Sequence, residues 1–278
     1  MGKSFSVSQF NWSTFLLDGG AMFGIIPRPL WSKLIPPDEN NGIRLAMRSL
    51  VIRCDDRTVL VDCGIWNYFP DKLRDSIYAI EQPDPAKNLA DNAGLAGDDI
   101  TDIIATHLHF DHVGGFAVRT NAGYATRFPN ARLHVQRSQL EWACNPSAKD
   151  RGSYVAPLVE LIRAHPHLVV HEGPWSLVPG IETDVANGHT PGMQIVRTKY
   201  ADNWLIHTAD MVPTSSHIPI PYIMAYDNEP LVTAREKEHL FSTWPEAIYF
   251  FEHDPGQPFW TITRTDRGGW IRKDPVTL

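Results

Sequence analysis

The sequence predicts an α/β protein in which two β-sheets are covered by helices, and three observations support this fold class. Short apolar strand patterns dominate the 278 residues, helical patterns occur between them at irregular intervals, and no repeat or Ser/Gly-rich linker divides the chain. A regular alternation of strand and helix would favour one parallel sheet, whereas this irregular order suits two sheets. We therefore expect a single domain over residues 1–278.

The N-terminal half supplies most of the predicted strands. Alternating side chains predict a strand over Phe10–Leu16, and residues 19–41, rich in Gly, Pro and large apolar residues, are expected to form a loop. Further strands are predicted at Leu45–Arg53, Thr58–Val61, Asp102–Ala105 and Arg132–Val135. Helices are predicted at Ala86–Gly94, from Ser138 onward, and at Tyr154–Ala164.

The C-terminal half repeats the pattern of short strand and loop. Strands are predicted at Leu168–Val170, Ile195–Arg197, Leu205–His207 and Ala247–Phe251. One helix is predicted near Ala234–Ser242. Polar residues follow several of these strands directly, which is where functional side chains are often found.

Composition excludes several classes of protein. The formal net charge is −7 and no basic run occurs, so no nucleic-acid partner is expected. No apolar stretch reaches the roughly 18 residues needed to cross a bilayer, and the N-terminus lacks the apolar region of a signal peptide, so we expect no membrane partner and a cytoplasmic protein. The three cysteines, Cys54, Cys63 and Cys144, form no C-x-x-C and are expected to be buried structural thiols.

The strongest signal is a histidine-rich segment that directly follows the strand predicted at Asp102–Ala105. It reads Thr-His-Leu-His-Phe-Asp-His-Val-Gly-Gly over residues 106–115. In an extended backbone His107 and His109 project to the same side, so both imidazoles can bind one metal ion. Asp111 and His112 are adjacent, and because neighbouring side chains diverge, they are better placed for a second ion. The two glycines are expected to let the backbone turn sharply away from the site.

Three further candidates lie downstream at His189, Asp210 and His253. His189 lies in the turn-rich segment 187–192, and the other two residues follow apolar strands. Each stands where a strand becomes a loop, and side chains at such positions can converge on one edge of a sheet. Each of the three is a weak signal by itself.

Together these residues resemble the metallo-β-lactamase-fold hydrolase superfamily, from the Asp-x-Gly at Asp62 to His253. The resemblance implies an αββα fold, with two mixed β-sheets packed face to face and helices outside. It also implies two Zn²⁺ ions per chain, other divalent metals being open. By the resemblance, one ion would be bound by His107, His109 and His189, the other by Asp111, His112 and His253, and Asp210 would bridge them. A bridging carboxylate offsets the repulsion of two dications about 3.5–4 Å apart.

Departures from the superfamily pattern narrow the family. Class B β-lactamases commonly have a cysteine near the position of Asp210, and flavodiiron oxidases have a glutamate at the position of His109. This chain has neither feature, so both families are excluded. Four segments, Leu17–Gly24, Pro29–Lys33, Thr106–His112 and Ala209–Thr214, are similar to the YtnP-type quorum-quenching lactonases, which open the ring of acyl-homoserine lactones. Pro213 stands where some lactonases carry a tyrosine, so a phenol at that position is excluded.

The resemblance implies a hydrolase in which a metal-bridging hydroxide attacks the carbonyl of a lactone or ester. Zinc lowers the pKa of bound water towards 7, and Asp111 is the candidate catalytic group that passes a proton to the departing alkoxide. Asp62 either orients a metal-bound imidazole or simply forms a turn. His207 is expected to be packed, although a supporting role near Asp210 stays open. The remaining histidines are expected at the surface or satisfied in the core: His134, His165, His167, His171, His217 and His239.

Two apolar stretches are candidates for the walls of a substrate pocket. The candidate residues are Met22, Phe23 and Trp31 in the first stretch, Tyr222 and Met224 in the second, and Phe110 in the histidine-rich segment. The alternative is that both stretches pack on the core. If they line a cleft, they suit an uncharged or acylated small molecule better than a polyanion, which favours a lactone or ester. The same apolar N-terminal loops also favour association of two copies of the chain as a homodimer.

Three rival functions stay open. Glyoxalase II-like thioester hydrolysis would use the same ligands, but basic residues for glutathione carboxylates would be expected near the C-terminus. Phosphodiester or organophosphate hydrolysis is open to the same two-metal chemistry. A non-catalytic metal-binding module would retain the ligands without turnover. Assays against the three substrate classes, together with metal analysis, separate these alternatives.

Overall fold

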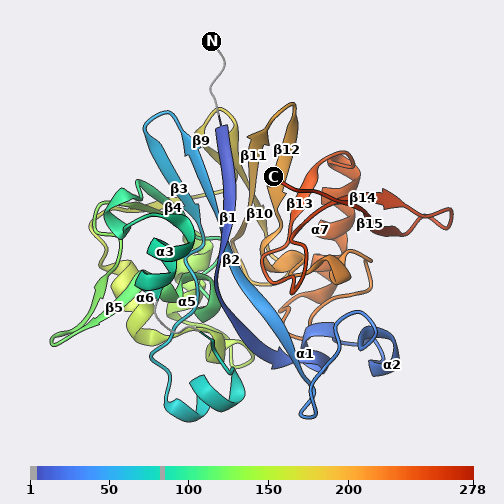
Figure 1. Cartoon of the computed structure of the whole chain (residues 1–278), viewed down its shortest axis with the longest axis horizontal. Coiled ribbons are helices and arrows are strands. Elements are labelled where there is room, and N and C mark those ends of the chain that lie inside the picture. The colour runs from blue at the N-terminus through green and yellow to red at the C-terminus, as the bar shows by residue number, and fades with distance from the viewer. Residues whose placement is uncertain (1–4, 82–84) are drawn as a thin grey trace. The chain divides into compact units, whose positions relative to one another are not determined.

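The computed structural model describes residues 5–81 and 85–278 (Figure 1). The chain divides into two compact units, each discontinuous in sequence. The first unit contains residues 1–14 and 47–175, and the second contains residues 15–46 and 176–278. The single domain expected over residues 1–278 stays a prediction.

The first unit is built on a mixed sheet with the strand order β1-β2-β3-β4-β7-β8. The strands are β1 (Phe5–Asp18), β2 (Gly42–Cys54), β3 (Arg57–Val61), β4 (Asp102–Ile104), β7 (Arg132–Gln136) and β8 (Leu168–His171). Residues 15–18 of β1 and 42–46 of β2 belong to the second unit. Strand β2 pairs antiparallel with β3, and the pairs from β3 through β4 and β7 to β8 are parallel. A separate hairpin is formed by β5 (Ala117–Thr120) and β6 (Gly123–Thr126). The central strand β4 is buried throughout, as expected for a strand between parallel neighbours.

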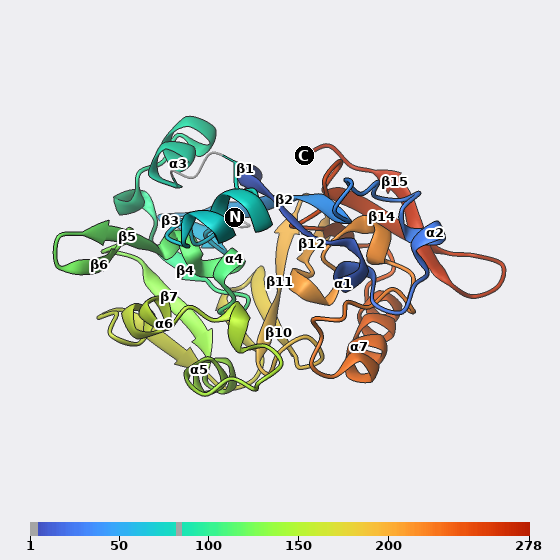
Figure 2. The ribbon, with the colours of Figure 1, turned by 90° about the horizontal axis from the view of Figure 1, so that it is seen from below.

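Helices follow the parallel strands of the first unit. They are α3 (Pro85–Ala93), α4 (Phe110–Val113), α5 (Arg137–Cys144) and α6 (Ala156–Arg163). Gly94, with φ +62°, ends α3, as the sequence predicted. Helix α5 leaves β7 directly and packs beside α6 (Figure 2). This arrangement places the short helix α4 directly after the loop that leaves β4.

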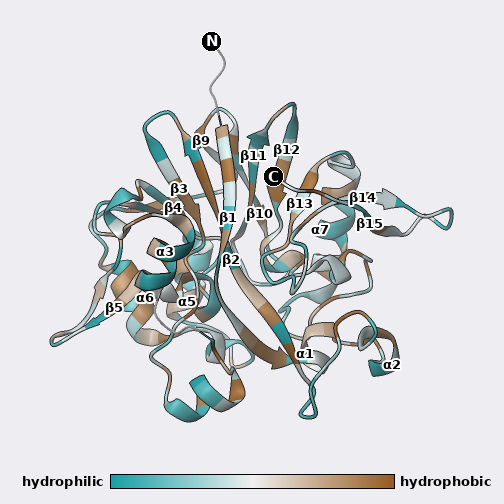
Figure 3. Ribbon diagram, in the orientation of Figure 1, coloured by the Kyte–Doolittle hydropathy of each residue, from teal (hydrophilic) through white to brown (hydrophobic). Residues whose placement is uncertain are grey.

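The second unit is built on a seven-stranded mixed sheet with the order β15-β14-β13-β12-β11-β10-β9. The strands are β9 (Trp175–Val178), β10 (Ile181–Ala186), β11 (Met193–Tyr200), β12 (Asn203–His207), β13 (Ile248–Phe250), β14 (Phe259–Arg264) and β15 (Trp270–Pro275). Only β12 and β13 pair in parallel among the registered pairs of this sheet. Brown, hydrophobic segments lie in its strands, whereas the tip of the β14–β15 hairpin is teal (Figure 3).

Three helices belong to the second unit: α1 (Gly19–Phe23), α2 (Arg28–Trp31) and α7 (Pro230–Thr243). Leu240 and Phe241 of α7 join the apolar core with residues of β11 to β14, including Ile195, Ile206 and Tyr249. Residues 208–229, which precede α7, contain only short 3-10 turns and irregular backbone. Helix α7 therefore covers the sheet and also borders a long irregular segment.

Most predicted elements are confirmed, with boundaries shifted by a few residues. The mixed α/β class with two main sheets is confirmed. The expectation of buried thiols is confirmed for Cys54 and Cys63 and was wrong for Cys144, which is exposed. The expectation of an uninterrupted loop over residues 19–41 was wrong, because α1 and α2 form there; Asp18 accepts a hydrogen bond from the Ala21 N–H and so caps α1. Within the described part of the chain, no helix is long and apolar enough to cross a membrane.

Candidate metal centre

The histidine-rich segment lies in the first unit, at the end of β4. His107 and His112 are fully buried, and His109 and Asp111 are 5% and 7% exposed. His109 precedes α4 in an extended conformation, and Asp111 and His112 lie on that helix. The extended backbone expected around His107 and His109 brings His107 Nε2 within 3.0 Å of His109 Nδ1. The prediction that these two imidazoles share one side is therefore confirmed as geometry.

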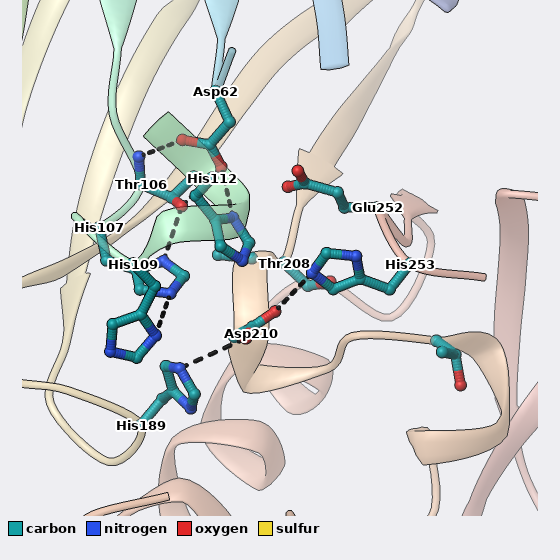
Figure 4. A network of polar contacts seen from close by, with 12 residues as sticks. Asp62, Thr106, His107, His109, His112, His189, Thr208, Asp210, Glu252 and His253 are labelled. Atoms are coloured by element: carbon teal, nitrogen blue, oxygen red, sulfur yellow. Dashed lines mark hydrogen bonds and ion pairs between the residues drawn. The ribbon is translucent and has the colours of Figure 1, made fainter. Parts of the chain in front are cut away.

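Asp62 is the centre of the hydrogen bonding around this segment (Figure 4). Its fully buried carboxylate accepts hydrogen bonds from the Thr106 backbone N–H at 2.7 Å and the Thr106 hydroxyl at 2.6 Å, and lies 3.0 Å from His112 Nδ1. Its backbone is also left-handed, with φ +56°, a conformation that aspartate tolerates better than most residues. Asp62 thus contacts a candidate metal-binding imidazole, which is the geometry that the orienting interpretation requires, whereas no turn is assigned at its position.

Thr106 links Asp62 to His107 through hydrogen bonds. Because the threonine hydroxyl donates to Asp62, its oxygen accepts from His107 Nδ1, 3.0 Å away. This direction of hydrogen bonding puts the His107 proton on Nδ1 and leaves Nε2 as a lone pair. An imidazole fixed in this tautomer is suited to bind a metal through Nε2.

Gly114, near the end of the histidine-rich segment, acts by close approach rather than by a sharp turn. Gly114 has an ordinary φ of −62°, so the expected conformational role is wrong for this residue. A Cβ atom there would lie 1.8 Å from the Trp66 backbone nitrogen. Hydrogen bonds from Cys63 N to His112 O and from Trp66 N to Phe110 O hold the two segments together. Gly114 therefore allows α4 to sit directly on residues 63–66.

Two residues that the sequence did not single out support the loop around His109. Gln139 of α5 accepts from the Leu108 backbone N–H at 3.3 Å and from the Tyr154 hydroxyl at 3.2 Å. The Tyr154 ring stands edge-on to His109, with centroids 4.8 Å apart. No local pattern in the sequence marks these residues, because they reach the loop through the packing of α5 and α6.

Phe110 belongs to an aromatic cluster beside Asp111. Its ring lies 5.2 Å from Phe69 and 5.0 Å from Tyr78, both of which are half-buried. Burial and the negative charge of Asp111 raise the pKa of the Tyr78 phenol. The segment that carries Asp111 therefore has an aromatic, partly accessible environment.

The second unit brings His189, Asp210 and His253 together. His189 follows β10, Asp210 lies in the 3-10 turn Ala209–Met211 after β12, and His253 follows β13. The two carboxylate oxygens of Asp210 face different imidazoles: Oδ2 lies 3.3 Å from His189 Nε2, and Oδ1 lies 3.3 Å from His253 Nε2 (Figure 4). The expectation that strand ends converge is confirmed for these three residues.

Both imidazoles that face Asp210 are held by their other nitrogen. His189 Nδ1 lies 2.8 Å from Asp227 Oδ1, and His253 Nδ1 lies 2.9 Å from the Ala46 carbonyl oxygen. Each Nδ1 therefore donates, and in the neutral ring each Nε2 then carries a lone pair directed at a carboxylate oxygen. Lone pairs and carboxylate oxygens repel unless a cation lies among them, so this donor set is one that fits metal ions.

Helix α7 and the residues before it fix the loop that carries His189. The Glu236 carboxylate accepts from the backbone N–H groups of Asn187 at 2.7 Å and Gly188 at 3.0 Å. A Cβ atom on Gly188 would lie 2.3 Å from the Thr233 backbone nitrogen, so the loop lies directly against α7. Sequence analysis missed Asp227 and Glu236, which lie more than 35 residues from His189 along the chain.

His207 supports the turn that carries Asp210. Its Nδ1 accepts from the Ala209 backbone N–H at 3.0 Å, so Nε2 carries the proton and faces Glu252 Oε2 at 3.2 Å. Both side chains are fully buried, and Ala209 has a left-handed φ of +47°. The expectation that His207 is packed is confirmed, and its contact with Ala209 also fixes the turn before Asp210.

The candidate pocket residues of the second unit form a buried stack. Phe23 stacks on Trp31 at 5.4 Å and on His217 at 4.5 Å, and Tyr222 stands edge-on to Phe23. Met22, Phe23, Trp31 and Met224 are at most 3% exposed, whereas Tyr222 is half-buried. The two apolar stretches therefore pack on each other, and Tyr222 is the more accessible member.

The histidines that were not assigned to the site are exposed or hydrogen-bonded, as predicted, except that Nδ1 of the buried His165 has no hydrogen-bond partner among the described residues. His134 lies 3.0 Å from both Asp102 and His171, and His165 lies 2.8 Å from the Ala131 carbonyl oxygen. His167 and His239 are exposed. Burial lowers the pKa of His217 to about 3 and, together with the charge of His134, that of His171 to about 4.

Comparisons with known proteins give a consistent result. The family model described as the metallo-beta-lactamase superfamily matches residues 48–275. The N-acyl homoserine lactonase AiiA of Bacillus thuringiensis subsp. kurstaki is 28% identical over 177 residues, which is 62% of this chain and 63% of that protein. The match thus spans less than two thirds of that relative's length.

Two solved structures share the fold over the whole chain. A probable metal-dependent hydrolase from Staphylococcus aureus is 27% identical, with a TM-score of 0.82 and 100% of both chains covered. The structure described as AidC, a dizinc quorum-quenching lactonase in complex with a product, is 18% identical, with a TM-score of 0.80 and coverage of 100% of this chain and 98% of that one.

Proposed function

The chain belongs to the metallo-β-lactamase superfamily, and on that basis we propose that it is a metal-dependent hydrolase of ester bonds, more narrowly a dinuclear zinc lactonase. The proposed substrate is an N-acyl homoserine lactone, whose ring would be opened by hydrolysis. The names of the relatives support this substrate, since AiiA is an N-acyl homoserine lactonase and AidC is a dizinc quorum-quenching lactonase.

One observation carries the proposal of two metals. The two oxygens of Asp210 each face Nε2 of a different imidazole at 3.3 Å. A carboxylate shared in this way between two imidazoles is what a ligand bridging two ions requires. In the proposal, one zinc ion is held by His107, His109 and His189, the other by Asp111, His112 and His253, and both by Asp210.

Two zinc ions in such a site would lower the pKa of bound water towards 7 and polarise the substrate carbonyl. The protein's own groups supply orientation and a proton. Asp62, Asp227 and the Ala46 carbonyl oxygen hold Nδ1 of the three candidate ligands His112, His189 and His253. In the proposal, the carboxylate of Asp111, which is 7% exposed, would take up the proton released by the attacking water and pass it to the departing alkoxide oxygen.

The surroundings of Asp111 favour an acylated substrate. Phe69, Tyr78 and Phe110 form a half-buried aromatic surface, which suits an apolar acyl chain better than a polyanion. The aromatic surface therefore makes the lactone the substrate class we propose first.

The test is a pH-stat assay of the purified protein, with its metal content measured on the same sample. Acyl-homoserine lactones of several chain lengths, thioesters and phosphodiesters are compared at equal concentration. We expect about two zinc ions per chain and fastest turnover of a lactone. Absence of turnover on every lactone would refute the proposed substrate class, and turnover of thioesters or phosphodiesters alone would replace it.

A further inference from the structure

Lys237 of α7 is a fully buried lysine in the second unit. Lysine is almost never fully buried unless its ammonium group is well satisfied. Here Nζ donates to the backbone carbonyl oxygens of His217 at 2.6 Å, Tyr222 at 2.9 Å and Pro219 at 3.0 Å, with that of Ile220 at 3.4 Å. The side chain is therefore enclosed by carbonyl oxygens, in the manner of a cation bound by a protein backbone.

The number of acceptors favours the protonated form of Lys237. An ammonium group donates three hydrogen bonds, whereas a neutral amine donates two and would turn a lone pair toward a carbonyl oxygen. Burial lowers the pKa of Lys237 to about 7, and the negative charge of Asp227 opposes this shift. The carbonyl oxygens thus stabilise a charge that burial alone would remove.

All four carbonyl groups come from residues 217–222, a segment whose carbonyl oxygens face Lys237 rather than a neighbouring strand. Pro219 and Pro221 lack an N–H group, and the segment is not part of a strand. Inside it, the Tyr222 backbone N–H donates to the Pro219 carbonyl oxygen at 3.0 Å. Buried carbonyl groups need partners, so the ammonium group supplies what a β-ladder would supply elsewhere.

Residues 217–222 lead directly to groups that matter for the proposed site. The Tyr222 ring contacts Phe23, and the Ala225 backbone N–H donates to the Ala21 carbonyl oxygen at 2.8 Å. The Asp227 backbone N–H then donates to the Met224 carbonyl oxygen at 3.2 Å, and its carboxylate holds His189. The conformation of residues 217–222 therefore determines how Tyr222 is presented.

We propose that Lys237 is a positioning residue whose ammonium group, by binding the carbonyl oxygens of residues 217–222, holds Tyr222 in place as a wall for the substrate's apolar chain. The positioning of the segment follows from the contacts of Lys237 alone. The role of Tyr222 as a wall rests on the proposed lactonase function. The two parts are therefore tested by different measurements.

The first measurement is amide hydrogen exchange in Lys237→Met, which keeps the apolar stem and removes the donor. Without the ammonium contacts, local opening of this segment costs less free energy. We therefore expect exchange of the Tyr222 and Ala225 amides to accelerate at least about tenfold. Arg235→Met is the matched control, since Arg235 is exposed on the same helix. Unchanged exchange in Lys237→Met would overturn the positioning role.

The second variant guards against a failure to fold. Lys237→Ala shortens the side chain, and added ethylammonium chloride offers an ammonium group to the same carbonyl oxygens. We expect ethylammonium to restore slow exchange or a higher unfolding temperature in Lys237→Ala, and sodium chloride at equal concentration not to do so. Equal effects of the two salts would also overturn the positioning role.

The third measurement separates positioning from general damage by steady-state kinetics. For long-chain acyl-homoserine lactones, Lys237→Met should raise KM about tenfold, with kcat changed by less than roughly threefold and the zinc content unchanged. Faster exchange with an unchanged KM would refute the wall while leaving the positioning intact. If the wild-type chain hydrolyses no lactone, the proposed function fails, and the exchange results still decide the role of Lys237.

Discussion

The two units present their candidate ligands in contrasting ways. In the first unit, His107, His109, Asp111 and His112 lie within six consecutive residues, and Asp62 contacts both Thr106 and His112. In the second unit, Asp227 holds His189, the Ala46 carbonyl oxygen holds His253, and His207 contacts the turn that carries Asp210. The first half is therefore organised around one buried carboxylate, whereas the second depends on the packing of several elements.

The largest expected effect comes from removing a ligand in either half. His109→Ala should reduce zinc from about two ions per chain to about one and lower turnover by about 10²–10³. Asp210→Ala should lower occupancy of both ions, because its two oxygens face two imidazoles. Metal analysis after gel filtration and the pH-stat assay measure both effects. The exposed His167 provides the control variant His167→Ala, and an unchanged zinc content in His109→Ala would contradict the assignment.

The first unit depends on one carboxylate and the second on several different groups, and this contrast can be tested at Asp62 and Asp227. Each asparagine variant should weaken zinc binding about 10–100-fold, because the imidazole loses its charged partner. Asp62→Asn should also lower the unfolding temperature more, since this side chain additionally accepts two hydrogen bonds from Thr106. Chelator competition and thermal unfolding measure the two effects. If Asp227→Asn lost more stability than Asp62→Asn, the conclusion that the first unit depends on a single carboxylate would be contradicted.

Close backbone approaches give the next comparison. Gly114→Ala would place a Cβ atom 1.8 Å from the Trp66 nitrogen, and Gly188→Ala would place one 2.3 Å from the Thr233 nitrogen. Backbone atoms cannot move aside cheaply, so each variant should lose about 1–3 kcal/mol of unfolding free energy, with Gly114→Ala the more affected. Urea denaturation measures the loss. Gly152→Ala, where a Cβ atom meets nothing within 4 Å, should be close to neutral, and equal stability of all three variants would contradict the close packing.

The same contrast explains how much the sequence could predict. The histidine-rich segment 106–115 could be predicted because its candidate ligands are close together in sequence and follow a buried strand. The hydrogen bonds of Asp227 and Glu236 to the loop at 187–189 were not predictable, because they depend on how α7 packs. Short or amphipathic strands were missed for a related reason: β5, β6, β9, β10, β14 and β15 have exposed or half-buried residues at many positions, which weakens the apolar pattern.

The smallest expected effect is a difference in the pH dependence of stability between His217 in the second unit and His171 in the first. His217 Nδ1 lies 2.7 Å from the Thr214 hydroxyl and Nε2 lies 2.9 Å from the Met22 carbonyl oxygen, so the buried neutral ring is satisfied. Because burial lowers its pKa to about 3, the unfolded chain takes up a proton below pH 6.5 and the folded chain does not. The stability that His217 contributes is fully present above pH 6.5 and is lost as the pH falls towards 3.

Urea unfolding at pH 7 and pH 5, with EDTA present throughout, isolates this contribution. Between these two pH values the wild-type chain should lose more unfolding free energy than His217→Gln, by at most about 1.4 kcal/mol per pH unit below 6.5. Glutamine is the chosen replacement because it remains uncharged and keeps an N–H donor for the Met22 carbonyl oxygen. His171→Gln should show a smaller difference, because His171 is only half-buried and water screens its charge. An equal pH dependence in the wild-type chain and His217→Gln would mean that the stacked ring accepts a proton without unfolding.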